Sequence, residues 1–270
     1  MVRLVIMGDM PEITLADVAQ EACVLLGAGS AILLQVAMRP VGLGVCEHST
    51  TLDRPVDRLR TTLTYVYVMA LGTPEEQRAV ARMVNRVHGP VRSEGRYDAF
   101  DPGLQLWVAA TLAHEGPRIH EQVFGAMDPA SRERVHRESA VYATALQVPA
   151  DDWPSDMAEF HDYWVRTLRT LEPDPAVQTF ARRLLSTRGQ PVLVRMLLPL
   201  QSLMARGGVP PEVRGVLGLP WSRVDRIAYA AFWMAFPTVY RRLPPPVRTL
   251  PARLYLRDFR RRRARGRRVI

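Results

Sequence analysis

The sequence predicts an all-α protein built as a single multi-helix domain. Apolar residues recur at three- and four-residue spacings, as in Val80, Met83, Val84 and Val87, which places them on one face of a helix. Strand-like alternation and hairpin dipeptides are scarce. A chain of 270 residues with 47% hydrophobic content can bury a large core, so one extended domain is the simplest expectation.

Helix starts are the clearest local signals. The longest apolar stretch, from Ala22 to Met38, predicts a buried core helix, because it falls short of the roughly 20 apolar residues that span a membrane. Later starts share an oxygen side chain that can cap free N–H groups, then proline or acids in the first turn. In chain order these starts are Thr73-Pro74-Glu75-Glu76, Asp101-Pro102, Asp128-Pro129, Ser155 before Met157-Ala158-Glu159, and Asp174-Pro175.

Glycine and proline predict the connections. Gly89 to Arg96, Gly116-Pro117 and Gly207 to Pro211 are expected to be short loops, none of them a domain linker. Pro244-Pro245-Pro246 marks an abrupt break. We therefore divide the chain into a main domain, residues 1–243, and a tail, residues 244–270, that is first proline-rich and then arginine-rich.

Charge is concentrated in that tail. All 36 basic residues are arginine, which excludes Schiff-base chemistry, and residues 256–270 carry +7 of the net +9. With Leu254, Tyr255 and Phe259 beside these charges, we predict weak, salt-sensitive contact with anionic membranes. A solvated, frayed terminus is the alternative, and nucleic acid ranks below the membrane.

The cysteines and the first residues of the chain indicate the cellular compartment of the protein. Cys23 and Cys46 have neither metal-ligand spacing nor a disulfide-scaffold pattern. No secretory signal is evident at the start. We expect a reduced, cytoplasmic protein, with peripheral membrane contact as an option.

Four spaced signatures between Ala28 and Leu112 point to a family. They are Gln35-Val36-Ala37-Met38-Arg39-Pro40-Val41-Gly42-Leu43-Gly44-Val45 ending in Glu47-His48-Ser49; Arg58-Leu59-Arg60-Thr61-Thr62; Val84-Asn85-Arg86-Val87-His88-Gly89-Pro90-Val91-Arg92; and Asp101-Pro102 leading into Leu106-Trp107-Val108-Ala109-Ala110-Thr111-Leu112. In order and spacing they resemble the MpaB-type oxygenase family, to which the rubber oxygenase latex clearing protein is related. The resemblance implies an all-helical protein that holds haem b, with His88 as the axial ligand of the iron.

The resemblance also implies roles around the haem. Arg58 and Thr62, one helical turn apart, would line the reactive side, and Arg86 or Arg92 would meet a propionate. Without the resemblance, His88 could simply cap the end of a helix, where the dipole favours it.

The remaining polar candidates are weaker. Glu47 and His48, in the loop after the first long helix, are candidates for a general base, which must lie close to the proton that it removes. A solvated Glu-His pair is the alternative. The other histidines are expected to be surface or packing residues, namely His114, His120, His136 and His161.

Three positions depart from the family pattern. Thr61 stands where the rubber oxygenase has a lysine that can ligate the iron, so a lysine-ligated state is impossible in this chain. Methionine, Met38, and an alanine in Trp107-Val108-Ala109-Ala110-Thr111 stand where commoner relatives have histidine.

Two functions follow from these observations. The first is a haem b-dependent oxygenase or peroxygenase-like oxidoreductase, acting on a hydrophobic small molecule with O₂ or peroxide. The second is a haem-free member of the fold that serves as a binding or membrane-associated scaffold protein. The spacing of residues excludes several other enzyme sites. The sequence has no His-Glu-x-x-His, no two Glu-x-x-His motifs such as a di-iron bundle needs, no glycine-rich phosphate loop and no Gly-x-Ser-x-Gly.

Overall fold

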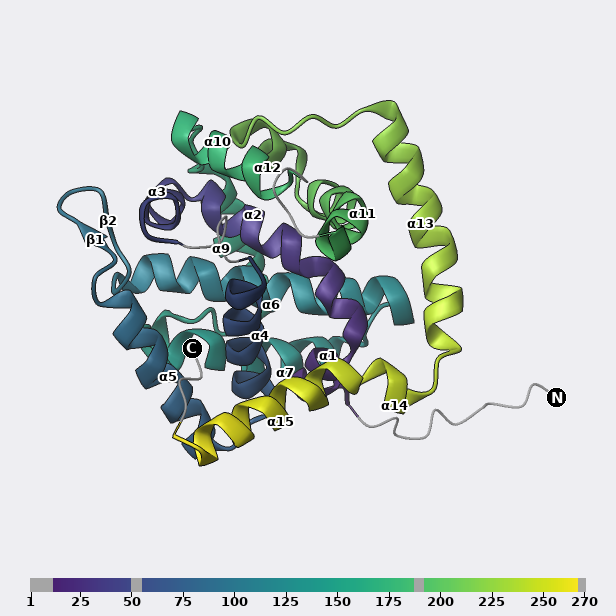
Figure 1. Cartoon of the computed structure of the whole chain (residues 1–270), viewed down its shortest axis with the longest axis horizontal. Helices are drawn as coiled ribbons and strands as arrows, with labels where there is room; N and C mark the ends of the chain where they lie inside the picture. Colours follow the sequence, from purple (N-terminus) through teal and green to yellow (C-terminus); the bar gives the residue numbers. More distant parts are fainter. Residues whose placement is uncertain (1–11, 50–54, 187–191, 267–270) are drawn as a thin grey trace.

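The computed structural model describes residues 12–49, 55–186 and 192–266, and these residues form an all-helical protein with a single small hairpin (Figure 1). The elements are α1 (Leu15–Gln20), the 3₁₀ helix η1 (Ala22–Gly27), α2 (Ala28–Ala37), α3 (Arg39–His48), α4 (Pro55–Leu71), α5 (Pro74–His88), β1 (Arg92–Ser93), β2 (Tyr97–Asp98), α6 (Pro102–Phe124), α7 (Pro129–Ser139), α8 (Val141–Thr144), the 3₁₀ helix η2 (Ala150–Asp152), α9 (Met157–Arg169), α10 (Pro175–Leu184), α11 (Val192–Gly208), α12 (Pro211–Val216), α13 (Arg223–Arg241), α14 (Pro245–Arg248) and α15 (Leu250–Ala264). The predicted fold class is confirmed.

The predicted helix starts are confirmed, with one shifted by a residue. Thr73 closes a capping box with Glu76, and the carboxylate of Asp101 accepts from Leu104 N at 3.0 Å. Asp128 and Asp174 cap α7 and α10 in the same way. The cap of α9 is Asp156 rather than Ser155, because the Asp156 carboxylate accepts from Glu159 N at 2.8 Å.

The apolar run after Glu21 is buried as predicted, but it is divided into η1 and α2. Leu33 and Leu34 are fully enclosed. Gly29 lets α11 approach, since a Cβ there would lie 2.7 Å from the Ala205 Cβ. No single helix among the described residues is long and apolar enough to cross a bilayer; residues 22–48 meet those criteria only as a pair of segments bent by 106°.

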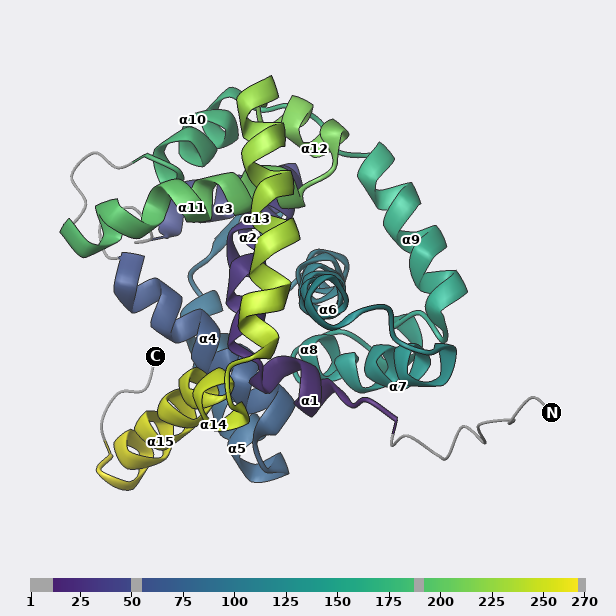
Figure 2. The same cartoon turned by 90° about the vertical axis from the view of Figure 1, so that its right-hand side faces the viewer.

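The long helix α6 runs through the middle of the molecule, between α2, α9 and α13 (Figure 2). The predicted loop at Gly116-Pro117 is wrong, because both residues lie inside α6. Proline removes a backbone donor and costs a helix interior about 3 kcal/mol. Ile119 and Val123, which follow Pro117 on α6, are each 1% exposed. Burial of these side chains offsets the cost of the proline.

One hydrophobic core joins both halves of the chain. The cluster around Leu33, Trp107 and Trp164 also contains Val177 and Leu217 from the helices beyond Pro173. Trp107 donates its indole N–H to Leu34 O at 3.0 Å, which fixes α6 against α2. The described residues therefore fold as a single domain.

The segment expected to be a separate tail packs on the body as α14 and α15. Phe259, 1% exposed, belongs to the main core, and the Tyr255 ring lies 5.5 Å from that of Tyr67. Arg260 donates to both carboxylate oxygens of Glu76, at 2.8 and 3.1 Å. The first residues of the expected main domain, 1–11, and the last residues of the expected tail, 267–270, lie outside the described residues. Arg267 and Arg268 are among them.

Both cysteines are free thiols, as expected. Burial raises the pKa of the Cys23 thiol to about 12, so this thiol stays protonated and unreactive.

Candidate functional site

The candidate site lies where the start of α4 meets the end of α5. His88 is the last residue of α5, and Gly89 N–H closes the helix by donating to Asn85 O at 3.0 Å. The His88 ring is partly buried, and its Nδ1 is enclosed without a hydrogen-bond partner in the described part of the chain. Burial lowers the pKa of His88, and the charge of Arg58 lowers it further. Neutral imidazole, the form that ligates a metal, is therefore favoured.

Arg58 is the charged neighbour of His88. Its Nε is enclosed and has no hydrogen-bond partner among the residues that the structure describes, and burial lowers the pKa of the guanidinium. A buried cation without a carboxylate is costly. The neutral His88 ring fits a metal, and the cationic Arg58 side chain fits an acidic group. Haem b, with its iron and its propionates, offers both.

Thr62 lies one helical turn from Arg58 on α4, as the sequence predicted, and is partly buried. Thr61, which stands where the rubber oxygenase is expected to have a lysine, donates its hydroxyl to Asp57 O at 3.0 Å within the same helix. Arg60 contacts the Asp57 carboxylate at 3.6 Å.

Glu47 and His48 belong to a different cluster, at the end of α3. Tyr97, from β2, donates its hydroxyl to the Glu47 carboxylate at 2.5 Å, and its oxygen lies 3.0 Å from His48 Nε2. Arg96 adds an ion pair to Glu47 at 2.6 Å. Among the described residues, no hydrogen bond or ion pair links this cluster to Arg58 or His88.

These contacts change what Glu47 can do. The hydrogen bond from Tyr97, then that from Arg96, lowers the pKa of the Glu47 carboxyl. A lowered pKa makes a carboxylate a poorer proton acceptor. Its observed role is to hold the hairpin on α3. Arg96 and Tyr97 were not predicted as its partners, since no local pattern relates them to a residue about 50 positions earlier.

The two arginines expected at a propionate are both exposed. Arg86 lies on the exposed side of α5. Arg92, in β1, lines an open pocket of about 560 Å³ with Tyr97 and Leu104. The side-chain carbonyl oxygen of the neighbouring Asn85 accepts from Gln147 Nε2 at 3.0 Å. Arg58 is therefore the better placed cation.

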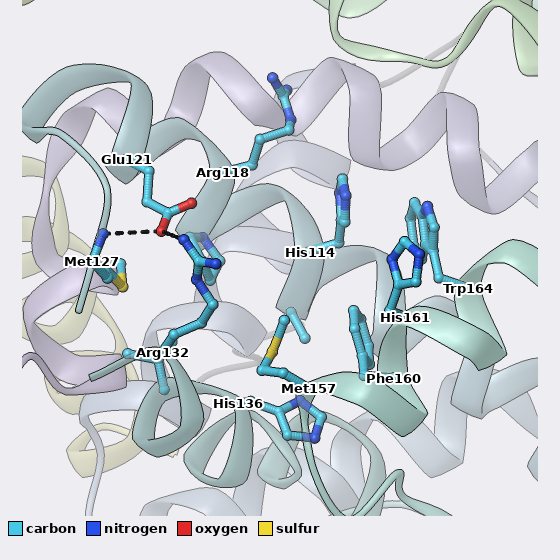
Figure 3. Close-up of a pocket in the computed structure, with 13 residues that line it drawn as sticks. His114, Arg118, Glu121, Met127, Arg132, His136, Met157, Phe160, His161 and Trp164 are labelled. Atoms are coloured by element: carbon cyan, nitrogen blue, oxygen red, sulfur yellow. Dashed lines mark hydrogen bonds and ion pairs between the residues drawn. The ribbon is translucent and has the colours of Figure 1, made fainter. Parts of the chain in front are cut away.

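A separate pocket of about 260 Å³ lies between α6, α7 and α9 (Figure 3). Its wall includes His114, stacked on Trp164 with ring centroids 4.1 Å apart, and its mouth includes the ion pair of Arg132 with Glu121 at 2.6 Å. His161 lines this pocket from α9 and is exposed.

The histidines outside the motif behave as predicted. His136 lies 2.7 Å from Pro154 O and stacks on Trp153, while His120 is buried beside Phe124. The described part of the chain brings together no group of three or more His, Cys, Asp or Glu side chains that could hold a metal ion. A haem iron needs fewer protein ligands than that, because the porphyrin supplies four nitrogens.

Comparison with known proteins identifies the family of the chain. A family model described as the catalytic domain of ER-bound oxygenase mpaB/B'/rubber oxygenase matches residues 16–242. Uncharacterized protein Rv2237 of Mycobacterium tuberculosis and uncharacterized protein Mb2261 of Mycobacterium bovis are each 32% identical over 248 residues, covering 88% of this chain and 97% of their own. No solved structure matches the chain. The chain therefore belongs to the MpaB and rubber oxygenase catalytic-domain family, a family of oxygenases.

Proposed function

We propose that the protein is a haem b-dependent oxygenase that acts on a hydrophobic small molecule, isoprenoid- or polyketide-like, with O₂ or peroxide as oxidant. The observation that carries the proposal concerns two neighbouring side chains: His88 Nδ1 and Arg58 Nε are both enclosed, and neither has a hydrogen-bond partner among the described residues. The influence of Arg58 on the pKa of His88 means that the two side chains lie within electrostatic reach of each other.

Haem b, when bound, would supply the activation of the oxidant. His88 would hold the iron, and its lowered pKa keeps the ring neutral and ready to bind without first losing a proton. Arg58 would donate N–H groups to a propionate or another anionic oxygen. Thr62 would add a hydroxyl that can donate or accept on the same face of α4.

Thr61 bears on which protein residues could ligate the haem iron. Its hydroxyl is engaged by its own helix, and a threonine cannot replace a lysine nitrogen. The protein would therefore give the iron one ligand, His88. Thr61, where the rubber oxygenase is expected to have a lysine, would not ligate the iron.

The test is the visible absorption spectrum of the purified protein loaded with haem b. We expect a strong Soret band that His88→Ala abolishes while the helical circular dichroism signal is kept. His161→Ala, which removes an exposed histidine on α9, is the matched control and should leave the spectrum unchanged. Arg58→Gln and Thr62→Val should reduce turnover far more than haem content.

Two outcomes would overturn the proposal. A wild-type Soret band in His88→Ala would show that another residue is the ligand. A wild-type protein that takes up no haem would favour the haem-free scaffold function instead.

A further inference from the structure

The outward face of α13 is apolar although it is open to solvent. Val224, Ile227 and Met234 are 75%, 61% and 81% exposed. These residues, together with the exposed alanines Ala228, Ala231 and Ala235, recur at three- and four-residue spacing and so form one stripe. The solvent face of a surface helix is normally polar, and a large exposed apolar patch marks an interaction site.

The two helices that follow also carry exposed apolar side chains. Val247 on α14 and Leu250 and Leu254 on α15 are 49%, 46% and 52% exposed. In Figure 2, α13 runs down the side that faces the viewer, and α14 lies directly below it, next to the start of α15. We call this combined surface the α13–α15 face and define it by six exposed residues, which are Val224, Ile227, Met234, Val247, Leu250 and Leu254.

The helices that carry the α13–α15 face are rich in arginine. Residues 222–266 contain twelve arginines and only two acidic residues. Both acids are already paired, Asp225 with Arg206 at 3.0 Å and Asp258 with Arg262 at 2.7 Å. The exposed arginines are Arg223, Arg226, Arg241, Arg242, Arg253, Arg257, Arg260, Arg261, Arg263 and Arg265, of which Arg260 and Arg263 pair with Glu76 and Glu75.

The opposite side of α13 is held on the body of the protein. Pro237 and Tyr240 are buried, and the Tyr240 hydroxyl donates to Glu21 at 2.8 Å. The Tyr229 ring packs so closely on α11 that a Cβ at Gly207 would lie 2.4 Å from it. The exposed stripe therefore belongs to a helix that is fixed along the surface.

We propose that the α13–α15 face docks the protein on the surface of an anionic lipid bilayer. Guanidinium groups bind lipid phosphates, and apolar side chains between them enter the boundary of the acyl chains. A second copy of the chain fits less well, because a two-fold contact through this face would oppose arginines. Duplex nucleic acid would satisfy the arginines and leave the apolar stripe in water. The docking is independent of the haem.

The test is co-sedimentation of the full chain with vesicles of phosphatidylcholine, alone or mixed with phosphatidylglycerol, at low and high salt. Ile227→Glu with Met234→Glu removes the apolar contact at exposed positions. Its control is Met196→Glu, at a 74% exposed position about three turns of α11 from Gly207, where α11 meets α13.

A second variant removes charge, with Arg241, Arg242, Arg253 and Arg257 changed to Gln. Its control changes the exposed arginines Arg78 and Arg82 of α5 to Gln. We expect binding to the anionic vesicles at low salt, weakened at least tenfold by the apolar variant, and weakened about fivefold per arginine by the charge variant. Neither control should change the binding.

Several outcomes would overturn the proposal. The full chain could fail to bind anionic vesicles at low salt, or the apolar variant could bind as tightly as the wild type. If the wild type sediments as a dimer without lipid and Ile227→Glu with Met234→Glu makes it a monomer, the face serves a second copy. If duplex DNA is bound while the vesicles are not, the arginines serve nucleic acid.

Discussion

Arg58→Met should stabilise the haem-free protein while it lowers oxygenase turnover. The guanidinium of Arg58 has an enclosed Nε that no described residue hydrogen-bonds. A buried donor left unsatisfied costs about 1–3 kcal/mol, and methionine fills similar space without that group. We expect the free energy of unfolding to rise by about that amount, and the Tm by about 2–4 °C per kcal/mol.

The assay is thermal and urea unfolding of the haem-free wild type and variant, followed by circular dichroism. Arg78→Met, at an exposed position of α5, is the control and should change stability by no more than about 0.5 kcal/mol. Turnover of the haem-loaded variant completes the comparison. Reduced stability of Arg58→Met, or unchanged turnover, would refute the argument that this unpaired cation is kept for the cofactor.

The same variant should change the response of the protein to pH. The pKa of His88 lies below its ordinary value, because burial and then the charge of Arg58 oppose protonation. The unfolded chain therefore binds this proton more readily. The resulting loss of stability begins as pH falls below the ordinary value of about 6.5 and continues to the folded-state pKa. Arg58→Met should raise the His88 pKa, measured by NMR titration, and so reduce this loss; an unchanged titration would mean that Arg58 does not act on the ring.

Two further predictions concern what holds the fold. Glu115, fully buried, accepts from Arg118 at 2.6 and 2.8 Å; burial alone would raise its pKa, but hydrogen bonds from His114 and Arg118 hold it at about 2. Glu115→Leu should therefore lower the free energy of unfolding by about 3–5 kcal/mol, and adding Arg118→Leu should recover most of the loss; no recovery would contradict the charge argument. Phe259→Ala should cost about 3–5 kcal/mol in urea unfolding, whereas the exposed control Arg257→Ala should cost less than about 0.5; equal effects would mean that α15 does not share the core.

Helix starts and spacing on one helix are predictable from the sequence because both depend on neighbours within a few residues. Thr73, Asp101, Asp128 and Asp174 cap their helices as predicted, since each side chain reaches a backbone N–H two or three positions later. The spacing of Arg58 and Thr62 follows in the same way from the helical period. The motif order was likewise sufficient to identify the family, which the match over residues 16–242 confirms.

Contacts between distant segments were decided only by the tertiary structure. The sequence made Glu47 a candidate general base but gave no sign that the fold would bring Tyr97 to its carboxylate. It placed a loop at Pro117, where burial of α6 outweighs a local signal. Nothing local indicated that Phe259 would enter the core or that the apolar stripe of α13 would stay exposed. The reason is physical: a cap or a helical period is settled by hydrogen bonds over a few residues, whereas burial depends on which distant surfaces meet.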